Sequence, residues 1–205
     1  IPLFVLMGLL VSESGLGRDI YEIANVTLGR LRGGLGVATV AANAIFAAIT
    51  GVSIASAAVF TRLSVPEMMR FGYRPRFAVG VVAGSSVLGM LIPPSVMLII
   101  YALIAEQSVA DLFTAGIIPG LLLSLAYSVA IVGMAYLLPE YVGGPDASTR
   151  AALMQETLGW LEATKKLLPL VVLIMLVLGG IYGGLFTPTE AGAVGAMGAL
   201  VTALL

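Results

Sequence analysis

The chain has 205 residues, 60% of them hydrophobic and 10% charged, and a net charge of −1. A soluble domain carries about 25% charged residues, so the composition excludes an ordinary soluble protein and indicates an all-α polytopic membrane protein. The sequence holds no Cys and no His, which removes disulfides, thiol chemistry, the commonest general base and the commonest metal ligand. We therefore expect neither an enzyme nor a cofactor, and the charge gives no indication of nucleic-acid binding.

Residues 1–32 form the first part of the chain. Residues 1–11 are apolar and are predicted to be the end of a spanning helix, which Gly15 and Gly17 end. Residues 18–31 have an apolar face formed by the residues Ile20, Ile23, Ala24, Thr27 and Leu31. This pattern predicts an amphipathic arm in the plane of the interface, with a surface helix of a connecting loop as the alternative. Both chain ends lie in apolar runs, so we expect a segment of a larger membrane protein.

The next part, 33–111, begins with a run without charge over 33–61, which is 29 residues long counted inclusively. About 20 helical residues cross a bilayer and two crossings need about 40, so this run suits two half-helices that meet at Thr50–Ser53. Arginines flank the run on both sides, and basic loops mark the cytoplasmic face. The pattern predicts a re-entrant hairpin; the alternative is one tilted helix with a basic loop on the outer side.

A second run without charge, 77–105, contains Pro93 and Pro94 at its centre. Each proline lacks an amide N–H and disfavours helix at the residue before it, so we expect a helix that is broken at mid-membrane depth. A simple proline kink is the alternative. Before this run, Ser64–Glu67 has the pattern of a capping box and predicts the start of a short helix that ends near Gly72.

The last part, 112–205, is predicted to contain two spans, 112–138 and 167–186, joined by a cytoplasmic amphipathic loop over 139–166. A second arm is expected at 151–164. Capping boxes at Ser108–Asp111 and Thr187–Glu190 predict two helix starts. Glu190 is then a capping residue, and the alternative is a functional carboxylate at the membrane edge.

The hairpin tip and the proline break are two polar interruptions in segments without charge. Carbonyl and hydroxyl oxygens without carboxylates suit Na⁺ rather than a divalent metal, and the N-termini of half-helices attract anions. A site with both features would couple Na⁺ to an organic anion. Asn43 and several serines are candidates to contribute to it, although each is also explained as a packing group between helices.

Five segments in order resemble the large membrane subunit of the tripartite ATP-independent periplasmic (TRAP) transporters. These segments are Ile1–Gly8, Phe46–Ala55, Leu91–Ser95, Leu112–Gly120 and Gly184–Ala191. The resemblance covers nearly the whole chain. It implies an elevator-type transporter in the bacterial or archaeal cytoplasmic (inner) membrane, with a re-entrant hairpin and a broken helix in its transport domain.

The resemblance further implies Na⁺-coupled import of organic acids such as C4-dicarboxylates, keto acids or sialic acid. It implies two partners, a periplasmic substrate-binding protein and a small four-helix membrane subunit. The implied Na⁺ site consists of Thr50, Gly51, Val52, Ser53, Gly89 and Pro93, and the implied substrate site of Ser53, Pro94 and Ser95. Asn43 is a further substrate-site candidate from its polar side chain in a segment without charge. Many members have a hydroxyl residue where this chain has Val52, which leaves a side-chain ligand at that position in doubt.

Two further functions stay open from the sequence. One is an anion symporter that uses Na⁺ but no binding protein, and the other is a channel with a re-entrant filter loop. The resemblance implies that the family's first spans precede residue 1 and that its second half follows residue 205. We therefore expect this chain to hold one half of the transport site and not to transport alone.

Overall fold

The computed structural model describes residues 2–29, 31–144 and 160–204. The regular elements of these residues are helices, which confirms an all-α fold. The expected arm at 151–164 lies mostly outside the described residues. The helices are α1 (Pro2–Glu13), α2 (Leu16–Leu28), α3 (Gly34–Thr50), α4 (Ser53–Arg70), α5 (Pro75–Ser86), α6 (Leu88–Leu91), α7 (Val96–Ala105), α8 (Val109–Leu137), α9 (Pro139–Val142), α11 (Trp160–Ile174), the π-helix Met175–Gly179, α12 (Gly180–Tyr182) and α13 (Pro188–Leu204).

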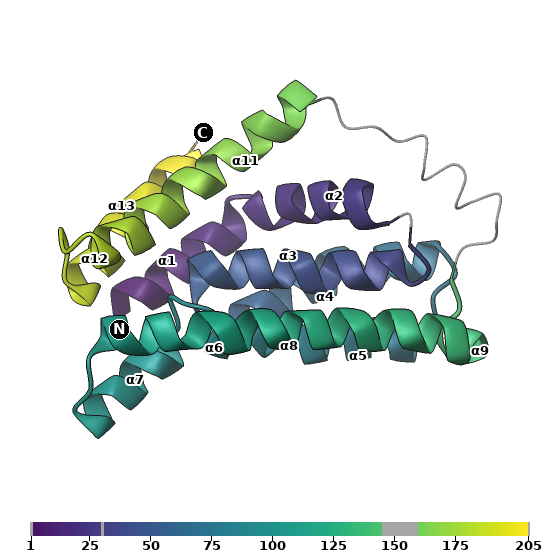
Figure 1. The fold of residues 1–205 in the computed structure, drawn as a ribbon. Coiled ribbons are helices and arrows are strands. Elements are labelled where there is room, and N and C mark those ends of the chain that lie inside the picture. The colour runs from purple at the N-terminus through teal and green to yellow at the C-terminus, as the bar shows by residue number, and fades with distance from the viewer. Residues whose placement is uncertain (1, 30, 145–159, 205) are drawn as a thin grey trace.

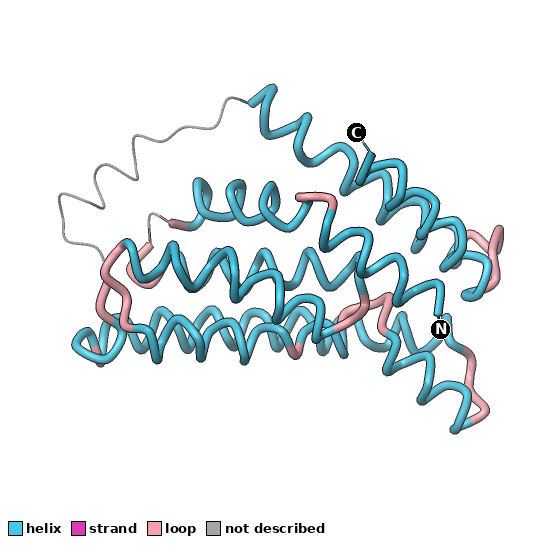
Figure 2. The backbone as a smooth tube through the Cα atoms, turned by 180° about the vertical axis from the view of Figure 1, so that it is seen from behind, coloured by secondary structure: helices cyan, strands magenta, loops and turns pink. Residues whose placement is uncertain are grey.

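The helices form two layers with α2 between them (Figures 1 and 2). One layer consists of α1 with α11, α12 and α13, and α1 packs along α13. The other consists of α3 to α8, in which α3 contacts α4, α5, α6 and α8. Helix α2 touches α3 in the second layer and α11 in the first, so it joins the two.

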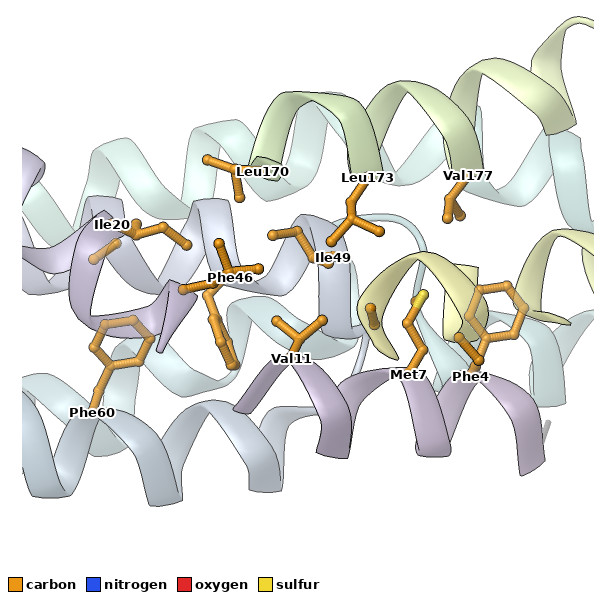
Figure 3. Close-up of a cluster of buried hydrophobic side chains, with 14 of the residues drawn as sticks. Phe4, Met7, Val11, Ile20, Phe46, Ile49, Phe60, Leu170, Leu173 and Val177 are labelled. Atoms are coloured by element: carbon orange, nitrogen blue, oxygen red, sulfur yellow. The ribbon is translucent and has the colours of Figure 1, made fainter. Parts of the chain in front are cut away.

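The main core lies where the two layers meet α2 (Figure 3). Phe46 of α3 and Phe60 of α4 meet edge to face, with ring centroids 5.5 Å apart and an interplanar angle of 89°. Val11 of α1 and Leu173 of α11 are buried in the same cluster. A second cluster, around Met68 and other buried side chains, joins α3, α4, α5 and α8.

Two helices are long and apolar enough to cross a membrane: α8, and the segment Thr164–Tyr182. The pair Pro75–Leu91 and Val96–Ala105 passes the same test together and is bent by 42° at its break. The break in the helix at the prolines is therefore confirmed, and helices long enough to span lie where the sequence predicts spans; that they cross the membrane there stays a prediction. In the most apolar part of α8 only 11% of the residues are buried, so most of its surface faces outward, as suits lipid or a partner.

Helices α3 and α4 run antiparallel and are joined by Gly51 and Val52 alone (Figure 2). Gly51 adopts the left-handed conformation, with φ 62°, which glycine reaches without steric cost. The chain therefore forms a helical hairpin with its tip where the sequence predicts it. That both ends of this hairpin lie on one side of the membrane stays a prediction.

The expected helix start at Ser64 is wrong, because α4 continues without a break from Ser53 to Arg70. Ser64 is fully buried in the middle of the helix rather than at a cap. A capping pattern is local and does not register whether the preceding residues are already helical. Here the apolar packing of Phe60 and Met68 on either side of Ser64 favours one continuous helix.

The other two predicted caps are confirmed. Ser108 Oγ accepts a hydrogen bond from the N–H of Asp111 at 3.3 Å. Thr187 and Glu190 bond reciprocally, since the Thr187 N–H donates to the Glu190 carboxylate at 2.8 Å and the Glu190 N–H donates to Thr187 Oγ1 at 3.4 Å. These bonds lower the pKa of the Glu190 carboxyl group, as expected of a capping residue. The preceding helix ends at Tyr182 rather than at Phe186.

Helix α2 confirms the predicted amphipathic helix but with a rotated apolar face. Ile20, Tyr21 and Ala24 are buried, whereas Leu31 beyond its end is exposed. Its charged side is tied to α11, because Lys166 Nζ lies 3.2 Å from an oxygen of Asp19 and also contacts the carboxylate of Glu22. The arm is therefore held from both layers.

Candidate functional site

The hairpin tip and the proline break meet in the structure. Helix α3 ends at Gly51, and α4 starts after Val52, whose backbone is extended. The second break lies between Leu91 and Val96, with extended backbone at Ile92 and Ser95 and a cis peptide bond between Pro93 and Pro94. Residues 89–96 follow residue 51 by 38 to 45 positions in the sequence. The two interruptions are nevertheless neighbours in space.

A backbone hydrogen bond joins the two breaks directly. The N–H of Val96, the first residue of α7, donates to the carbonyl oxygen of Gly51 at 3.1 Å. A Cβ on Gly51 would lie only 2.1 Å from the Pro94 carbonyl oxygen, and one on Gly89 would lie 3.0 Å from the Ser53 nitrogen. Only glycine allows the two backbones to approach so closely.

Four helix ends converge at this junction. The C-termini of α3 and α6 bring carbonyl oxygens, and the N-termini of α4 and α7 bring N–H groups. The first N–H groups of α4 have no side-chain cap, because Val52 occupies the cap position. Since helix ends carry opposite partial charges, the junction offers acceptors for a cation and donors for an anion within one small region.

Two hydroxyl groups of the junction, those of Thr50 and Ser95, have defined partners. Thr50 Oγ1 donates to the carbonyl of Phe46 at 3.0 Å. Ser95 Oγ donates to the carbonyl of Met90 at 2.7 Å and accepts the N–H of Leu98 at 3.4 Å. A hydroxyl oxygen that donates one bond keeps lone pairs for a cation, so Thr50 remains a possible ligand. Ser95 holds the break and caps α7.

The set of oxygens at the junction fits Na⁺. The described residues contain no group of three or more Asp and Glu side chains that could hold a metal ion, and the junction residues Thr50–Ser53 and Gly89–Ser95 include no carboxylate. Neutral carbonyl and hydroxyl oxygens replace the water shell of a monovalent cation better than that of a divalent one. Thr50, Gly51, Val52, Ser53, Gly89 and Pro93 are all placed at or beside this junction.

Asn43 does not lie at the junction. It is seven residues before Thr50 in α3, which is about 10 Å along the helix axis. Its side chain is fully buried, and Nδ2 donates to Ser85 Oγ at 2.6 Å in the contact between α3 and α5. Its Oδ1 has no partner among the described residues. Of the expected substrate residues, the structure brings together Ser53, Pro94 and Ser95.

Glycines of α1 and α8 support the junction and were not assigned to it from the sequence. A Cβ on Gly8 of α1 would lie 3.2 Å from the Thr50 carbonyl oxygen. Corresponding atoms on Gly116 and Gly120 of α8 would lie 2.7 Å from the Leu91 carbonyl oxygen and 2.8 Å from Ile92. All three glycines lie in the family-like segments Ile1–Gly8 and Leu112–Gly120, but neither these segments nor the spacing of four between Gly116 and Gly120 indicates which backbone the glycines contact.

The sequence is similar to proteins of one transporter family. The family model described as "Tripartite ATP-independent periplasmic transporter, DctM component" matches residues 1–205. The chain is 40% identical over 204 residues to the C4-dicarboxylate TRAP transporter large permease protein DctM of Pseudomonas aeruginosa, covering 100% of this chain and 46% of that protein.

Two further relatives are named for other compounds. The sialic acid TRAP transporter large permease protein SiaM of Vibrio cholerae is 36% identical, over 98% of this chain and 45% of that protein. The isethionate TRAP transporter permease protein DctMQ of Oleidesulfovibrio alaskensis is 35% identical, over 98% of this chain and 30% of that protein. The chain thus spans less than half the length of these relatives.

These relatives are transporter permeases rather than enzymes, and the long apolar helices agree with a multi-pass protein of the inner membrane. The match over the full 205 residues and the five motifs in order leave one assignment: the chain belongs to the DctM component family of the tripartite ATP-independent periplasmic transporters.

Proposed function

We propose that the protein imports organic acid anions across the inner membrane, driven by Na⁺, and that this chain supplies one half of the transport site. The observation that carries the proposal is the convergence of four helix ends at the bond between the Val96 N–H and the Gly51 carbonyl. The names of the relatives supply the class of substrate, since a C4-dicarboxylate, sialic acid and isethionate are all organic acids.

In this proposal Na⁺ binds at the carboxyl ends of α3 and α6. The ligands are backbone carbonyl oxygens of Thr50–Val52 and of Gly89–Pro93, with the hydroxyl of Thr50 as a further oxygen. Because the carbonyls belong to helix ends, they carry partial negative charge without a proton to lose. The cation then neutralises the acceptors and holds the hairpin tip against the break.

The anionic substrate binds on the opposite side of the same junction. The uncapped N–H groups of α4, beginning at Ser53, attract a carboxylate or sulfonate group, and Pro94 and Ser95 form the neighbouring wall. Na⁺ and the anion would each favour the arrangement in which the hairpin tip contacts the proline break. This shared preference gives a coupling free energy between the two ligands.

The partners follow from family membership. We propose that a periplasmic binding protein delivers the substrate and that a small membrane subunit accompanies the permease. The remaining length of the relatives would provide the second half of the site. This chain by itself should therefore show no Na⁺-dependent uptake.

The test is uptake of labelled acids into proteoliposomes that contain the complete permease and its small subunit. Succinate, N-acetylneuraminate and isethionate are each supplied with the cognate binding protein under an inward Na⁺ gradient. The proposal predicts that one class of acid accumulates only when Na⁺ and the binding protein are both present. Replacing Na⁺ with K⁺ should abolish accumulation.

Two other outcomes would favour the alternatives. Na⁺-driven accumulation without the binding protein would favour an independent symporter. Flux that never exceeds the equilibrium distribution and that ignores the Na⁺ gradient would favour a channel. Either result would contradict the proposal in its full form.

A further inference from the structure

Helix α8 contacts the proline break through two glycines. A Cβ on Gly116 would lie 2.7 Å from the carbonyl oxygen of Leu91, the last residue of α6. A Cβ on Gly120 would lie 2.8 Å from Cγ1 of Ile92, the residue that follows α6. Both glycines are buried, and their spacing of four places them on one face of the helix. The break therefore lies so close to this face that a methyl group has no room.

The other end of α8 is attached to the base of the hairpin. The buried side chain of Ile131 fits between Gly33 and Gly36, where α3 begins. Cβ atoms on these two glycines would lie 3.2 Å and 3.0 Å from Cγ2 of Ile131. Further along α8, the guanidinium of Arg32 lies 5.0 Å from the centre of the Tyr136 ring, which adds a cation–π contact. Helix α8 thus holds the base of the hairpin as well as the proline break.

The two attachments of α8 are as far apart as the base and the tip of α3. Ile131 follows Gly116 by 15 positions, and Gly51 follows Gly36 by 15 positions, so each stretch rises about 22 Å. The two helices lie side by side and run in opposite directions (Figure 1). Because α8 is one continuous helix from Val109 to Leu137, it holds the proline break at the level of the hairpin tip.

We propose that Gly116 and Gly120 are positioning residues for the Na⁺ site, and that α8 sets the distance between the hairpin tip and the proline break. This inference rests on the proposed function, in which carbonyl oxygens of both segments bind Na⁺. Residues that orient the ligands of a metal ion affect its affinity even when they do not touch the ion. A methyl group at either glycine displaces the break from α8 and changes the distances between those oxygens.

A role of the glycines in helix packing alone leads to a different expectation. Small residues allow helices in a membrane to approach closely, and their replacement then lowers stability. The affinity for Na⁺ would stay the same in that case, because the site itself would keep its geometry. The concentration of Na⁺ that gives half-maximal uptake (K½) therefore distinguishes positioning from packing, whereas Tm alone does not.

Uptake into proteoliposomes by the complete permease, with its small subunit and binding protein, measures K½ for Na⁺. Gly116→Ala should raise K½ about tenfold, the lower end of the range for residues that orient metal ligands, and should affect the rate at saturating Na⁺ less. Gly133→Ala is the matched control on the same helix, because a Cβ there meets nothing within 4 Å. This control should keep the wild-type K½.

A double-mutant cycle tests the contact between Gly120 and Ile92 and remains informative if Gly116→Ala fails to fold. Gly120→Ala should raise K½ for Na⁺ when Ile92 is present. In the Ile92→Ala background, the Cγ1 atom that the new methyl group meets is absent, so the same substitution should change K½ little. Equal effects in the two backgrounds would contradict a role of this contact.

The far attachment of α8 separates positioning from a general loss of stability. Ile131→Ala empties the space between Gly33 and Gly36 and should raise K½ for Na⁺. Ile181→Ala removes a similarly buried isoleucine from the other layer and should lower Tm while K½ stays at the wild-type value.

Two results would count against the inference in different ways. If wild-type uptake depends on Na⁺ but Gly116→Ala, Gly120→Ala and Ile131→Ala all keep the wild-type K½, the positioning role of α8 is overturned and the proposed function stands. If wild-type uptake does not depend on Na⁺, the proposed function itself is contradicted, and the inference is overturned with it.

Discussion

Gly51 and Pro94 approach so closely that a Cβ on Gly51 would lie 2.1 Å from the Pro94 carbonyl oxygen. The contact fixes the hairpin tip on the proline break, and the nearby hydrogen bond from Val96 reinforces it. Each interruption would leave backbone groups of an isolated helix without partners. Here the Val96 N–H of one interruption bonds to the Gly51 carbonyl of the other. The predictions below follow from this junction and from the packing around it.

Gly51→Ala should abolish most transport. The added methyl group clashes with backbone rather than with a flexible side chain, and φ 62° is strained for alanine. The tip must then move, and a displacement of about 1 Å in a site costs about a hundredfold in rate. Initial rates of Na⁺-driven uptake check this result. Gly80→Ala is the control, because a Cβ on Gly80 meets nothing within 4 Å; equal rates in the two variants would refute the role of the junction.

Asn43→Ala should destabilise the protein and leave the KM for substrate unchanged. Asn43 and Ser85 are both buried and bonded at 2.6 Å, so removing one partner costs about 1–3 kcal/mol. Thermal unfolding and uptake kinetics measure the two effects separately. In a double-mutant cycle, Ser85→Ala should cost little more once Asn43 is gone. A raised KM with unchanged Tm would instead make Asn43 a substrate ligand.

Lys166→Met should loosen the attachment of α2 to α11. The ammonium group contacts Asp19 and Glu22, and a partly exposed network of this kind contributes up to about 1 kcal/mol. The decrease in Tm relative to the wild type should be larger in low KCl than in high KCl, because salt screens exposed charges. Lys165→Met removes a neighbouring exposed charge as the control. A loss of Tm that does not depend on salt would point to packing instead.

The cap at Thr187 and Glu190 should make stability depend on pH. Folding lowers the pKa of Glu190, so its stabilisation is present above the ordinary carboxyl pKa. That stabilisation is lost as the pH falls through the lowered value. Glu190→Gln should therefore lower Tm at pH 7, and the difference should disappear in acid. Thr187→Ala should cost about 1 kcal/mol. Glu140→Gln is the control for the loss of an exposed carboxylate; a difference that persists in acid would contradict the cap.

Much of the architecture was predictable because its signals are covalent or local. Pro93 and Pro94 must interrupt a helix, and Gly51 is the residue that permits a sharp left-handed turn. Caps such as Ser108 show in the sequence because both partners lie within one turn. These features placed the hairpin tip and the break correctly from the sequence alone.

Other features depend on contacts between distant segments and could not be predicted. Ser64 has the pattern of a cap but lies inside α4, because packing on both sides keeps the helix continuous. Asn43 sits on an apolar helix, and only the structure reveals its bond to Ser85. Likewise, the contact of Gly116 with the Leu91 carbonyl requires the approach of α8, which no local pattern encodes.

The most direct test of the account is the side of the membrane on which the two ends of the hairpin lie. Leu31→Cys and Met69→Cys introduce single cysteines at exposed positions without removing a flanking arginine, in the complete protein without other cysteines. A membrane-impermeant maleimide is applied from each side. The account predicts that both positions react only from the cytoplasmic side. Labelling from opposite sides would show that 33–61 crosses the membrane once, and the proposed Na⁺ site would lose its structural basis.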